Sequence, residues 1–357
     1  MVSPLDDLPI REDLRGQKPY GAPQLSVPVS LNVNENTHGI PETVALAIVE
    51  KLAQATIGLN RYPDREFLEL RQQLATFLGH SLLAENIWAA NGSNEILQQL
   101  FSAFGGPGRK ALSFSPTYSM YPNIARTTLT AYVEKPRNPD FTLSPDLIVS
   151  AIREERPGLV ILCSPNNPTG TPLSLDCVAA AYEATDGIVI VDEAYAEFSD
   201  RDSALTLLAG RPRLVVSRTM SKAFAFAGAR LGYLAADSAV VDALRIVRLP
   251  YHLSALTQAA ASAALEHSEL LLQNVQKIKQ QRDRIIEAAK QWGLTPSPSD
   301  ANFVLIGGFQ DPNKTFEQLL AAGVLVRNVG IPNTLRITAG TEAETTKLLA
   351  ELALVLD

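Results

Sequence analysis

The chain has 357 residues, of which 46% are hydrophobic, so it is long enough to bury the cores of two domains. Its formal net charge is -7 and its sequence pI is about 5.3, and this acidic balance argues against nucleic acid or an anionic membrane as a partner. The absence of any run of about 18 apolar residues excludes a transmembrane helix. Two cysteines, Cys163 and Cys177, are too few for a disulfide framework or a cysteine-rich metal site.

The N-terminal part of the chain is predicted to be an extended arm covering residues 1–30. Its segment from Lys18 to Pro23 is rich in Pro and Gly, which favour turns and extended backbone. The stretch from Met1 to Arg15 is acidic and polar, so we expect no secretory signal and a soluble, cytoplasmic protein. Helical patterns follow at Pro41–Ala55 and Asp64–Leu78.

The middle of the chain alternates short apolar runs with amphipathic segments such as Ser174–Ala184. Continuous apolar strands between helices are typical of a mostly parallel sheet covered on both faces, which is an α/β domain. The apolar runs are Ala111–Phe114, Leu159–Cys163, Ile188–Val191, Leu214–Ser217 and Leu231–Ala235.

Beyond Pro250 the pattern changes to that of a smaller α+β domain. Residues Ala255–Trp292 form an almost unbroken helical pattern. Short strands are predicted at Phe303–Ile306, Val324–Arg327 and Leu335–Thr338. The sequence therefore predicts an arm at 1–30, a large domain at 31–255 and a small domain at 256–357, joined by a long helix.

Polar residues follow several of the apolar runs, at the carboxyl ends of strands where open parallel sheets bind ligands. Asp192 ends the run at 188–191, and a buried acid there needs a cation or strong donors. A protonated ring nitrogen of a cofactor satisfies that need; capping of the next turn is the alternative. Tyr195 lies three residues on, where it can approach a phenolic oxygen of the same ring.

The segment Ser164–Gly170 is dense in turn-forming residues. Asn167 precedes a proline, which holds its backbone out of the helical region and allows its amide to point at a ligand. A plain surface turn is the alternative interpretation.

Lys222 enters the apolar stretch Ala223–Ala227. A lysine in apolar surroundings with cations nearby has a lowered pKa, which Schiff-base chemistry requires. Thr219, Ser221 and Arg230 are candidates for holding a phosphate, and a simply exposed lysine is the alternative.

The motif Asn91–Glu95 opens the helical stretch Ile96–Phe104. A small polar residue such as Ser93, placed after a glycine at a helix N-terminus, makes an anion site, although ordinary capping is the alternative. Taken in order, these motifs provide the parts of a binding site for one cofactor. They are a phosphate site, an acid for a ring nitrogen, a tyrosine for a phenolic oxygen and a lysine that can form a Schiff base.

With these motifs the chain resembles the fold-type I, class I and II aminotransferases over nearly its whole length, and within them the group of histidinol-phosphate aminotransferases. The resemblance implies a large domain with a mostly parallel seven-stranded sheet and a smaller α+β domain. The motifs that carry it are Asn34-Glu35-Asn36, Arg61-Tyr62-Pro63-Asp64, Asn91-Gly92-Ser93-Asn94-Glu95, Pro116 to Tyr121, Asn167-Pro168-Thr169-Gly170, Asp192-Glu193-Ala194-Tyr195, Ser221-Lys222-Ala223-Phe224, Asn302-Phe303-Val304, Val326-Arg327 and Leu335-Arg336-Ile337-Thr338.

The resemblance implies pyridoxal 5'-phosphate as the cofactor. Lys222 would form the Schiff base and move a proton between substrate and cofactor carbons, Asp192 would pair with the pyridinium nitrogen, and Tyr195 would complete the catalytic set. The further implied cofactor residues are Asn167 with Tyr195 at the ring hydroxyl oxygen, Tyr118 stacked on the ring, Ser93, Asn94, Thr219, Ser221 and Arg230 at the phosphate, and Tyr62 from the second subunit of a homodimer.

The implied reaction transfers an amino group between L-histidinol phosphate and 2-oxoglutarate, giving 3-(imidazol-4-yl)-2-oxopropyl phosphate and L-glutamate, in histidine biosynthesis. Tyr20, Arg327 and Arg336 would hold the anionic end of the substrate, with Asn36 and Tyr251 close by. Paired guanidinium groups suit this task, because they bind phosphate and carboxylate alike.

Two positions depart from the resemblance without removing an essential group: Thr37 stands where Pro is frequent, and Asn94 where Asp is common. Three alternatives keep the same scaffold. They are an aromatic amino-acid aminotransferase, a pyridoxal-phosphate-dependent decarboxylase of an amino-acid phosphate, and a non-enzymatic cofactor-binding regulator. The last would carry an added DNA-binding domain, whereas only a short acidic arm precedes the fold here. The four histidines show no metal-ligand spacing, so no metal is expected.

Overall fold

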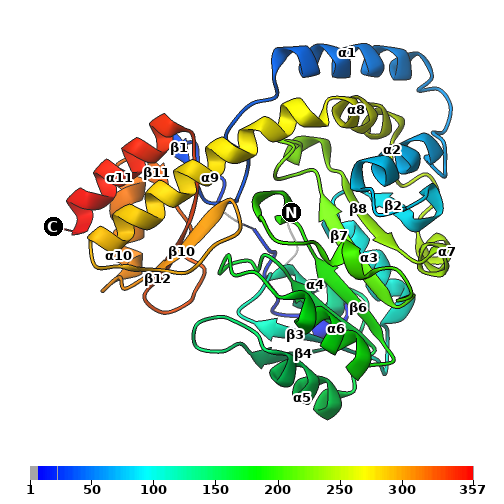
Figure 1. Ribbon diagram of the computed structural model, residues 1–357, viewed down its shortest axis with the longest axis horizontal. Helices are drawn as coiled ribbons and strands as arrows, with labels where there is room; N and C mark the ends of the chain where they lie inside the picture. The colour runs from blue at the N-terminus through cyan, green and yellow to red at the C-terminus, as the bar shows by residue number, and fades with distance from the viewer. Residues whose placement is uncertain (1–6, 22, 357) are drawn as a thin grey trace.

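A central seven-stranded sheet lies at the core of the larger part of the molecule (Figure 1). The computed structural model describes residues 7–21 and 23–356. Strand β8 runs antiparallel to both of its neighbours and the other pairs are parallel, which confirms the predicted mostly parallel sheet. In spatial order the strands are β2 (Ile87–Ala90), β8 (Gly232–Ala236), β7 (Leu214–Thr219), β6 (Ile188–Asp192), β5 (Leu159–Cys163), β3 (Lys110–Ser115) and β4 (Ala131–Pro136).

Helices cover the sheet, and the inner strands β5 and β6 are buried along their whole length. Ser144 and Ser174 cap two of these helices, since each hydroxyl accepts a hydrogen bond from a backbone N–H of the first turn. The helices around the sheet are α3 (Ser93–Phe104), α4 (Met120–Thr127), α5 (Pro145–Glu155), α6 (Leu175–Ala184) and α7 (Ser238–Val247). Short 3₁₀ turns are η2 (Glu12–Leu14), η3 (Ala84–Asn86), η4 (Ala196–Phe198), η5 (Ala204–Leu207) and η6 (Ala227–Ala229).

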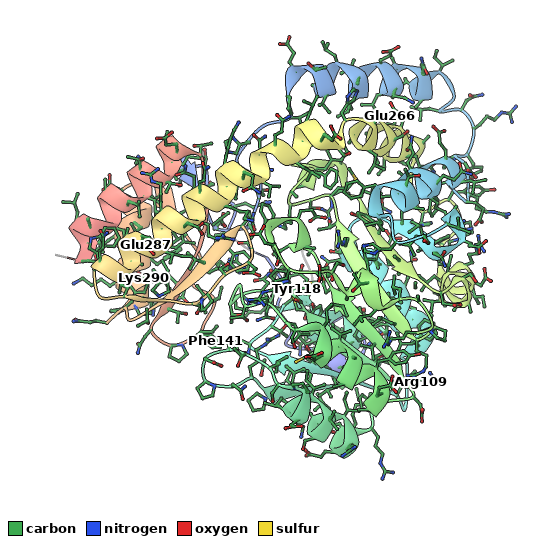
Figure 2. The ribbon with its side chains drawn as sticks, in the orientation of Figure 1. Arg109, Tyr118, Phe141, Glu266, Glu287 and Lys290 are labelled. Atoms are coloured by element: carbon green, nitrogen blue, oxygen red, sulfur yellow. The ribbon has the colours of Figure 1, made fainter. Side chains whose placement is uncertain are left out.

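The predicted helix Ala255–Trp292 is divided in two at His267, whose φ of -117° and ψ of 25° leave the helical region. The Ala-rich first part, α8 (Ala255–Glu266), packs against α1 (Glu42–Ile57) and α2 (Leu68–Leu78). Figure 2 labels Glu266 at the end of α8, where it accepts a hydrogen bond of 3.0 Å from Lys51 of α1. Helix α8 therefore packs against helices that precede the large sheet in the chain.

The second part, α9 (Ser268–Gln291), runs from the large domain along the small one (Figure 1). The small domain contains an antiparallel sheet of β9 (Thr295–Pro296), β10 (Phe303–Gly307) and β12 (Thr334–Thr338), with helices α10 (Pro312–Ala321) and α11 (Glu342–Leu356). Among the residues with a described position, no helix is both long and apolar enough to cross a membrane.

The end of the predicted arm is bonded to the small domain. Strand β1 (Val29–Ser30) pairs in parallel with β11 (Val324–Leu325), which is shorter than the predicted strand at 324–327. Leu31 continues this pairing, because its N–H donates to the Leu325 carbonyl and its own carbonyl accepts from Thr338. The next residues, 32–36, are thereby held between the two domains.

Candidate active site

Most of the predicted site residues gather around one cavity of about 360 Å³ at the carboxyl ends of β5, β6 and β7. Figure 2 labels Tyr118 in this region, between the large sheet and the small domain. The predicted residues that line the cavity are Tyr20, Ser93, Asn94, Tyr118, Asn167, Asp192, Tyr195, Thr219, Ser221, Lys222, Arg230, Arg327 and Arg336.

Asp192 is the last residue of β6, and its buried carboxylate is only half satisfied. Oδ2 accepts a hydrogen bond of 2.8 Å from Tyr121, whereas Oδ1 has no partner among the described residues. Burial raises the pKa of Asp192 to about 6. A protonated ring nitrogen supplies both the donor and the charge that this oxygen lacks, so the site fits the implied pyridine-ring cofactor.

The Tyr195 hydroxyl is held from two sides. Asn34 and Asn167 donate to its oxygen at 3.0 and 3.3 Å, respectively. Asn34 is itself fixed by two hydrogen bonds with Thr338 of β12, at 3.0 and 3.1 Å. Since both amides donate, the Tyr195 hydroxyl keeps its own proton for a ligand in the cavity. Burial raises the pKa of Tyr195, so that proton is retained at neutral pH.

Asn34 and Tyr121 belong to motifs that carry the resemblance, but the sequence assigned neither of them a role. Asn34 contacts Tyr195 across 161 positions of the chain, and Tyr121 contacts Asp192 across 71. The only local signal for Tyr121 is its place three residues after Tyr118, whose carbonyl accepts a hydrogen bond from the Tyr121 N–H.

Lys222 lies partly buried beside the cavity, and its amine donates to the Val33 carbonyl at 3.1 Å. Burial, with the positive charges of Arg336 and Arg230, lowers its pKa to about 8. A lysine with this pKa is partly neutral at physiological pH, and only the neutral amine attacks an aldehyde.

This lowered pKa predicts the pH dependence of cofactor capture. If the pKa of Lys222 is about 8, the neutral fraction of its amine rises about tenfold between pH 7 and pH 9 and then levels off. We expect the rate constant for pyridoxal phosphate binding to the apo-protein, followed by cofactor absorbance, to follow this curve. A rate that still climbs steeply above pH 9 would mean that the lysine has an ordinary pKa.

A second group of side chains lies near the N-terminus of α3, where Ser93 is the first helical residue, and it is the candidate anion site. Thr219 and Ser221 are joined by a hydrogen bond of 3.0 Å, and the Arg230 guanidinium reaches the Ser221 hydroxyl at 3.4 Å. Gly92 leaves the space for Arg230, because a Cβ at position 92 would lie 2.4 Å from its Nη2.

Replacing Gly92 with Ala is therefore expected to weaken cofactor binding about tenfold or more, by displacing Arg230 from the anion site. The φ of +86° adds backbone strain. Gly228→Ala is the matched control, since a Cβ there meets nothing within 4 Å. The measurement is the dissociation constant of pyridoxal phosphate, and equal constants for the two variants would contradict the assignment of Arg230.

Arg336 and Arg327 bring two guanidinium groups to the wall of the cavity. Arg336 is buried and donates to the Asn167 side chain at 2.8 Å and to the Asn32 carbonyl at 2.6 Å, while its Nε has no partner in the described structure. Arg327 is joined to Arg336 by paired backbone hydrogen bonds, so both guanidinium groups start from adjacent strand positions. Tyr20 reaches the same cavity from the arm.

Three predicted residues lie outside the cavity. Asn36 donates to the Ala223 carbonyl at 3.0 Å, so it holds the segment that follows Lys222. Tyr62 and Tyr251 stack on each other with ring centroids 4.4 Å apart, and the Tyr62 side chain is 79% exposed. None of these three residues lines the cavity.

A buried ion-pair network lies behind the strand ends. Arg218 of β7 donates to Glu193 at 2.8 Å and lies 3.5 Å from Glu197. Glu193 directly follows Asp192, and Arg218 precedes Thr219, so the network ties the ends of β6 and β7 together.

Across residues 7–21 and 23–356, no group of three His, Cys, Asp or Glu residues is placed to hold a metal ion.

Comparisons with known proteins identify the family to which the chain is similar. Residues 26–352 match the family model described as aminotransferase class I and II. The chain is 61% identical to a histidinol-phosphate aminotransferase of Paenarthrobacter aurescens, over 99% of this chain and 96% of the relative. It is 56% identical to one of Thermobifida fusca, over 95% and 93%, respectively. The crystal structure of a histidinol-phosphate aminotransferase from Sinorhizobium meliloti, in complex with pyridoxal-5'-phosphate, superposes with a TM-score of 0.84 at 28% identity, covering 92% of this chain and 91% of the other.

Proposed function

The chain belongs to the class I and II aminotransferase family, and from that membership we propose that it transfers an amino group between L-histidinol phosphate and 2-oxoglutarate in histidine biosynthesis. It is a pyridoxal-phosphate-dependent transaminase. The products are 3-(imidazol-4-yl)-2-oxopropyl phosphate and L-glutamate. The observation that carries the substrate is the pair Arg327 and Arg336, which face the same cavity as Lys222.

The cofactor, when bound, supplies an aldehyde that exchanges amino groups and a ring that takes up the electron pair of the broken bond. Lys222 would supply the neutral amine that bonds to the cofactor, and the same amine would carry a proton between the substrate and cofactor carbons. The Asp192 carboxylate would hold the ring-nitrogen proton, and Tyr195 and Asn167 would bind the ring hydroxyl oxygen. Tyr118 would cover the ring face. The cofactor phosphate would be held by Ser93, Asn94, Thr219, Ser221 and Arg230.

The two arginines explain how one pocket serves both halves of the reaction. A guanidinium binds a phosphate monoester and a carboxylate with the same two parallel N–H groups. Arg336 is fixed by Asn167 and Asn32, so it is preorganised for either anion. Arg327 and Tyr20 favour the phosphate ester over an apolar aromatic substrate, because they add a positive charge and a hydroxyl where a phenyl ring needs apolar surface.

The test compares the two leading substrate classes. The purified enzyme, loaded with pyridoxal phosphate, is mixed with histidinol phosphate or with phenylalanine, and each half-reaction is followed by cofactor absorbance. We expect the second-order rate constant of the half-reaction to be at least about 100-fold higher for histidinol phosphate than for phenylalanine. This ratio corresponds to about 3 kcal/mol of additional binding free energy from charge-assisted hydrogen bonds. Equal or reversed rates would remove the specific substrate and leave the transaminase family unaffected.

We further propose that the enzyme is a homodimer in which Tyr62 reaches the cofactor phosphate of the other subunit. Hydrogen bonds from Arg245 and Arg248 to Glu66 bring the end of α7 beside the loop that carries Tyr62. Exposed apolar side chains gather on α1, on this loop and at the end of α7, as expected of a surface that a partner covers. They include Leu46, Val49, Ile57, Leu59, Ile246 and Leu249.

Mixing two defective variants tests this arrangement. Lys222→Ala and Tyr62→Ala subunits, dissociated and reassembled together, should form mixed dimers with one complete site. Random assembly then restores about one quarter of the wild-type activity. If Tyr62 serves its own subunit, or if the protein is a monomer in sedimentation experiments, mixing restores nothing.

A further inference from the structure

Tyr121 approaches the proposed cofactor site from behind. It lies in the first turn of α4, is fully buried, and is not among the residues that line the cavity. Its hydroxyl donates to Asp192 Oδ2 at 2.8 Å, while Oδ1 of the same carboxylate has no partner among the described residues. The two carboxylate oxygens therefore have separate environments: one is occupied by the protein and the other is available to a ligand.

The same ring also contacts a second residue of the site. Tyr121 meets Tyr118 edge to face, with ring centroids 5.4 Å apart and an interplanar angle of 84°. Tyr118 lines the cavity and donates to Asn94 at 3.2 Å. Tyr121 thus supports both the acid expected at the ring nitrogen and the aromatic residue expected on the ring face.

We propose that Tyr121 is a positioning residue whose hydroxyl fixes Asp192 so that Oδ1 faces the cofactor ring nitrogen and the carboxylate stays ionised. The inference rests on the proposed cofactor site. A buried carboxylate without donors shifts to its neutral form, and a hydrogen bond to the charged form opposes that shift. Burial raises the pKa of Tyr121 far above neutral, so its hydroxyl remains a donor at every working pH.

The proposal predicts that Tyr121→Phe weakens binding of pyridoxal phosphate through Asp192 alone. One charge-assisted hydrogen bond corresponds to about a 10- to 100-fold change in the dissociation constant. The other groups that act on the Asp192 pKa are the Ala194 backbone N–H, which lowers it, and the Glu193 carboxylate, which raises it, and the variant keeps both. The loss should therefore grow as the pH falls from 8 towards 6, because without the tyrosine donor Asp192 takes up its proton at a higher pH. The cofactor absorbance at equilibrium, titrated into the apo-protein, gives the constant at each pH.

A double-mutant cycle separates positioning from simple packing. Asp192→Asn keeps the side-chain shape and removes the charge, and in that background Tyr121→Phe should change the constant by less than about threefold. Tyr233→Phe is the matched control, since Tyr233 is equally buried but lies on β8, two strands away from Asp192. Thermal unfolding of each apo-variant verifies that it is folded.

The outcomes are distinct. The proposal is supported if Tyr121→Phe weakens the binding of pyridoxal phosphate only when Asp192 is present. The weakening should also be larger at low pH and absent in Tyr233→Phe. An unchanged constant in Tyr121→Phe overturns it, as does an equal loss with and without Asp192, which would make Tyr121 a packing residue. If Asp192→Asn itself binds pyridoxal phosphate like the wild type, the cofactor-site premise fails instead, and the proposed function fails with it.

Discussion

Replacing Lys222 with Ala is expected to abolish steady turnover, with kcat reduced by about 10⁴-fold or more. The variant loses the amine that bonds to the cofactor and the group that carries the proton between the two carbons. No neighbouring lysine replaces it, because Lys222 is the one lysine among the described residues that line the cavity. The measurement is the steady-state rate with histidinol phosphate and 2-oxoglutarate.

Lys290→Ala serves as the matched control, since Lys290 is exposed and bonded to Glu287 on the surface of α9. It should keep wild-type activity. Borohydride reduction of the loaded wild-type enzyme, followed by peptide mass measurement, should place the cofactor on the peptide that contains Lys222. Activity above about 1% of wild type in Lys222→Ala, or a label on another peptide, would refute the assignment.

Replacing Arg336 with Ala is expected to lower kcat/KM about 100-fold or more for both amino donors, histidinol phosphate and glutamate. The change removes the guanidinium group that is expected to bind the anionic group of the substrate. The loss of two charge-assisted hydrogen bonds corresponds to about 3 kcal/mol of binding free energy. It also leaves Asn167 without its guanidinium partner. Arg336→Lys should recover only part of the loss, since an ammonium keeps the charge but not the planar fork.

Arg327→Ala provides the comparison. Arg327 lines the same end of the cavity, and we assign it to the doubly charged phosphate, so its loss should affect histidinol phosphate more than glutamate. Circular dichroism of each variant checks the fold. An Arg336→Ala enzyme with wild-type kcat/KM for both donors would show that the anion binds elsewhere.

Much of the sheet could be predicted from the sequence, because β5, β6 and the first part of β7 are apolar runs. Such runs are typical of strands that are covered on both faces of a sheet. Two strands escaped prediction for physical reasons. Half of β2 is alanine, which is depleted in strands, and β4 is an edge strand whose exposed and half-exposed side chains do not form an apolar run. The division of the long helical pattern at His267 was also missed, since one non-helical residue hardly changes the periodicity.

The candidate site divides in the same way. Asp192 ends β6, and Lys222 and Asn167 lie in the loops that follow β7 and β5. Their positions are therefore local consequences of the chain, and all three line the cavity. The partners of these residues were harder to predict, because Tyr121 and Asn34 reach the site through contacts between distant segments. Three predicted residues, Asn36, Tyr62 and Tyr251, lie outside the cavity. Their spacing in the sequence does not indicate that they lie outside it.

The segment Leu31–Asn34 has a consequence for how the enzyme can be divided. It is bonded to β11 and Thr338 on one side, while Val33 accepts from Lys222 and Asn34 donates to Tyr195 on the other. A fragment containing only residues 87–236 would keep all seven strands of the large sheet but would lack the contacts that orient its lysine and its phenol. The expected catalytic site thus needs residues from both sides of the Leu31–Asn34 segment. A design that transfers the large sheet to another protein as a cofactor-binding unit would have to include these four residues.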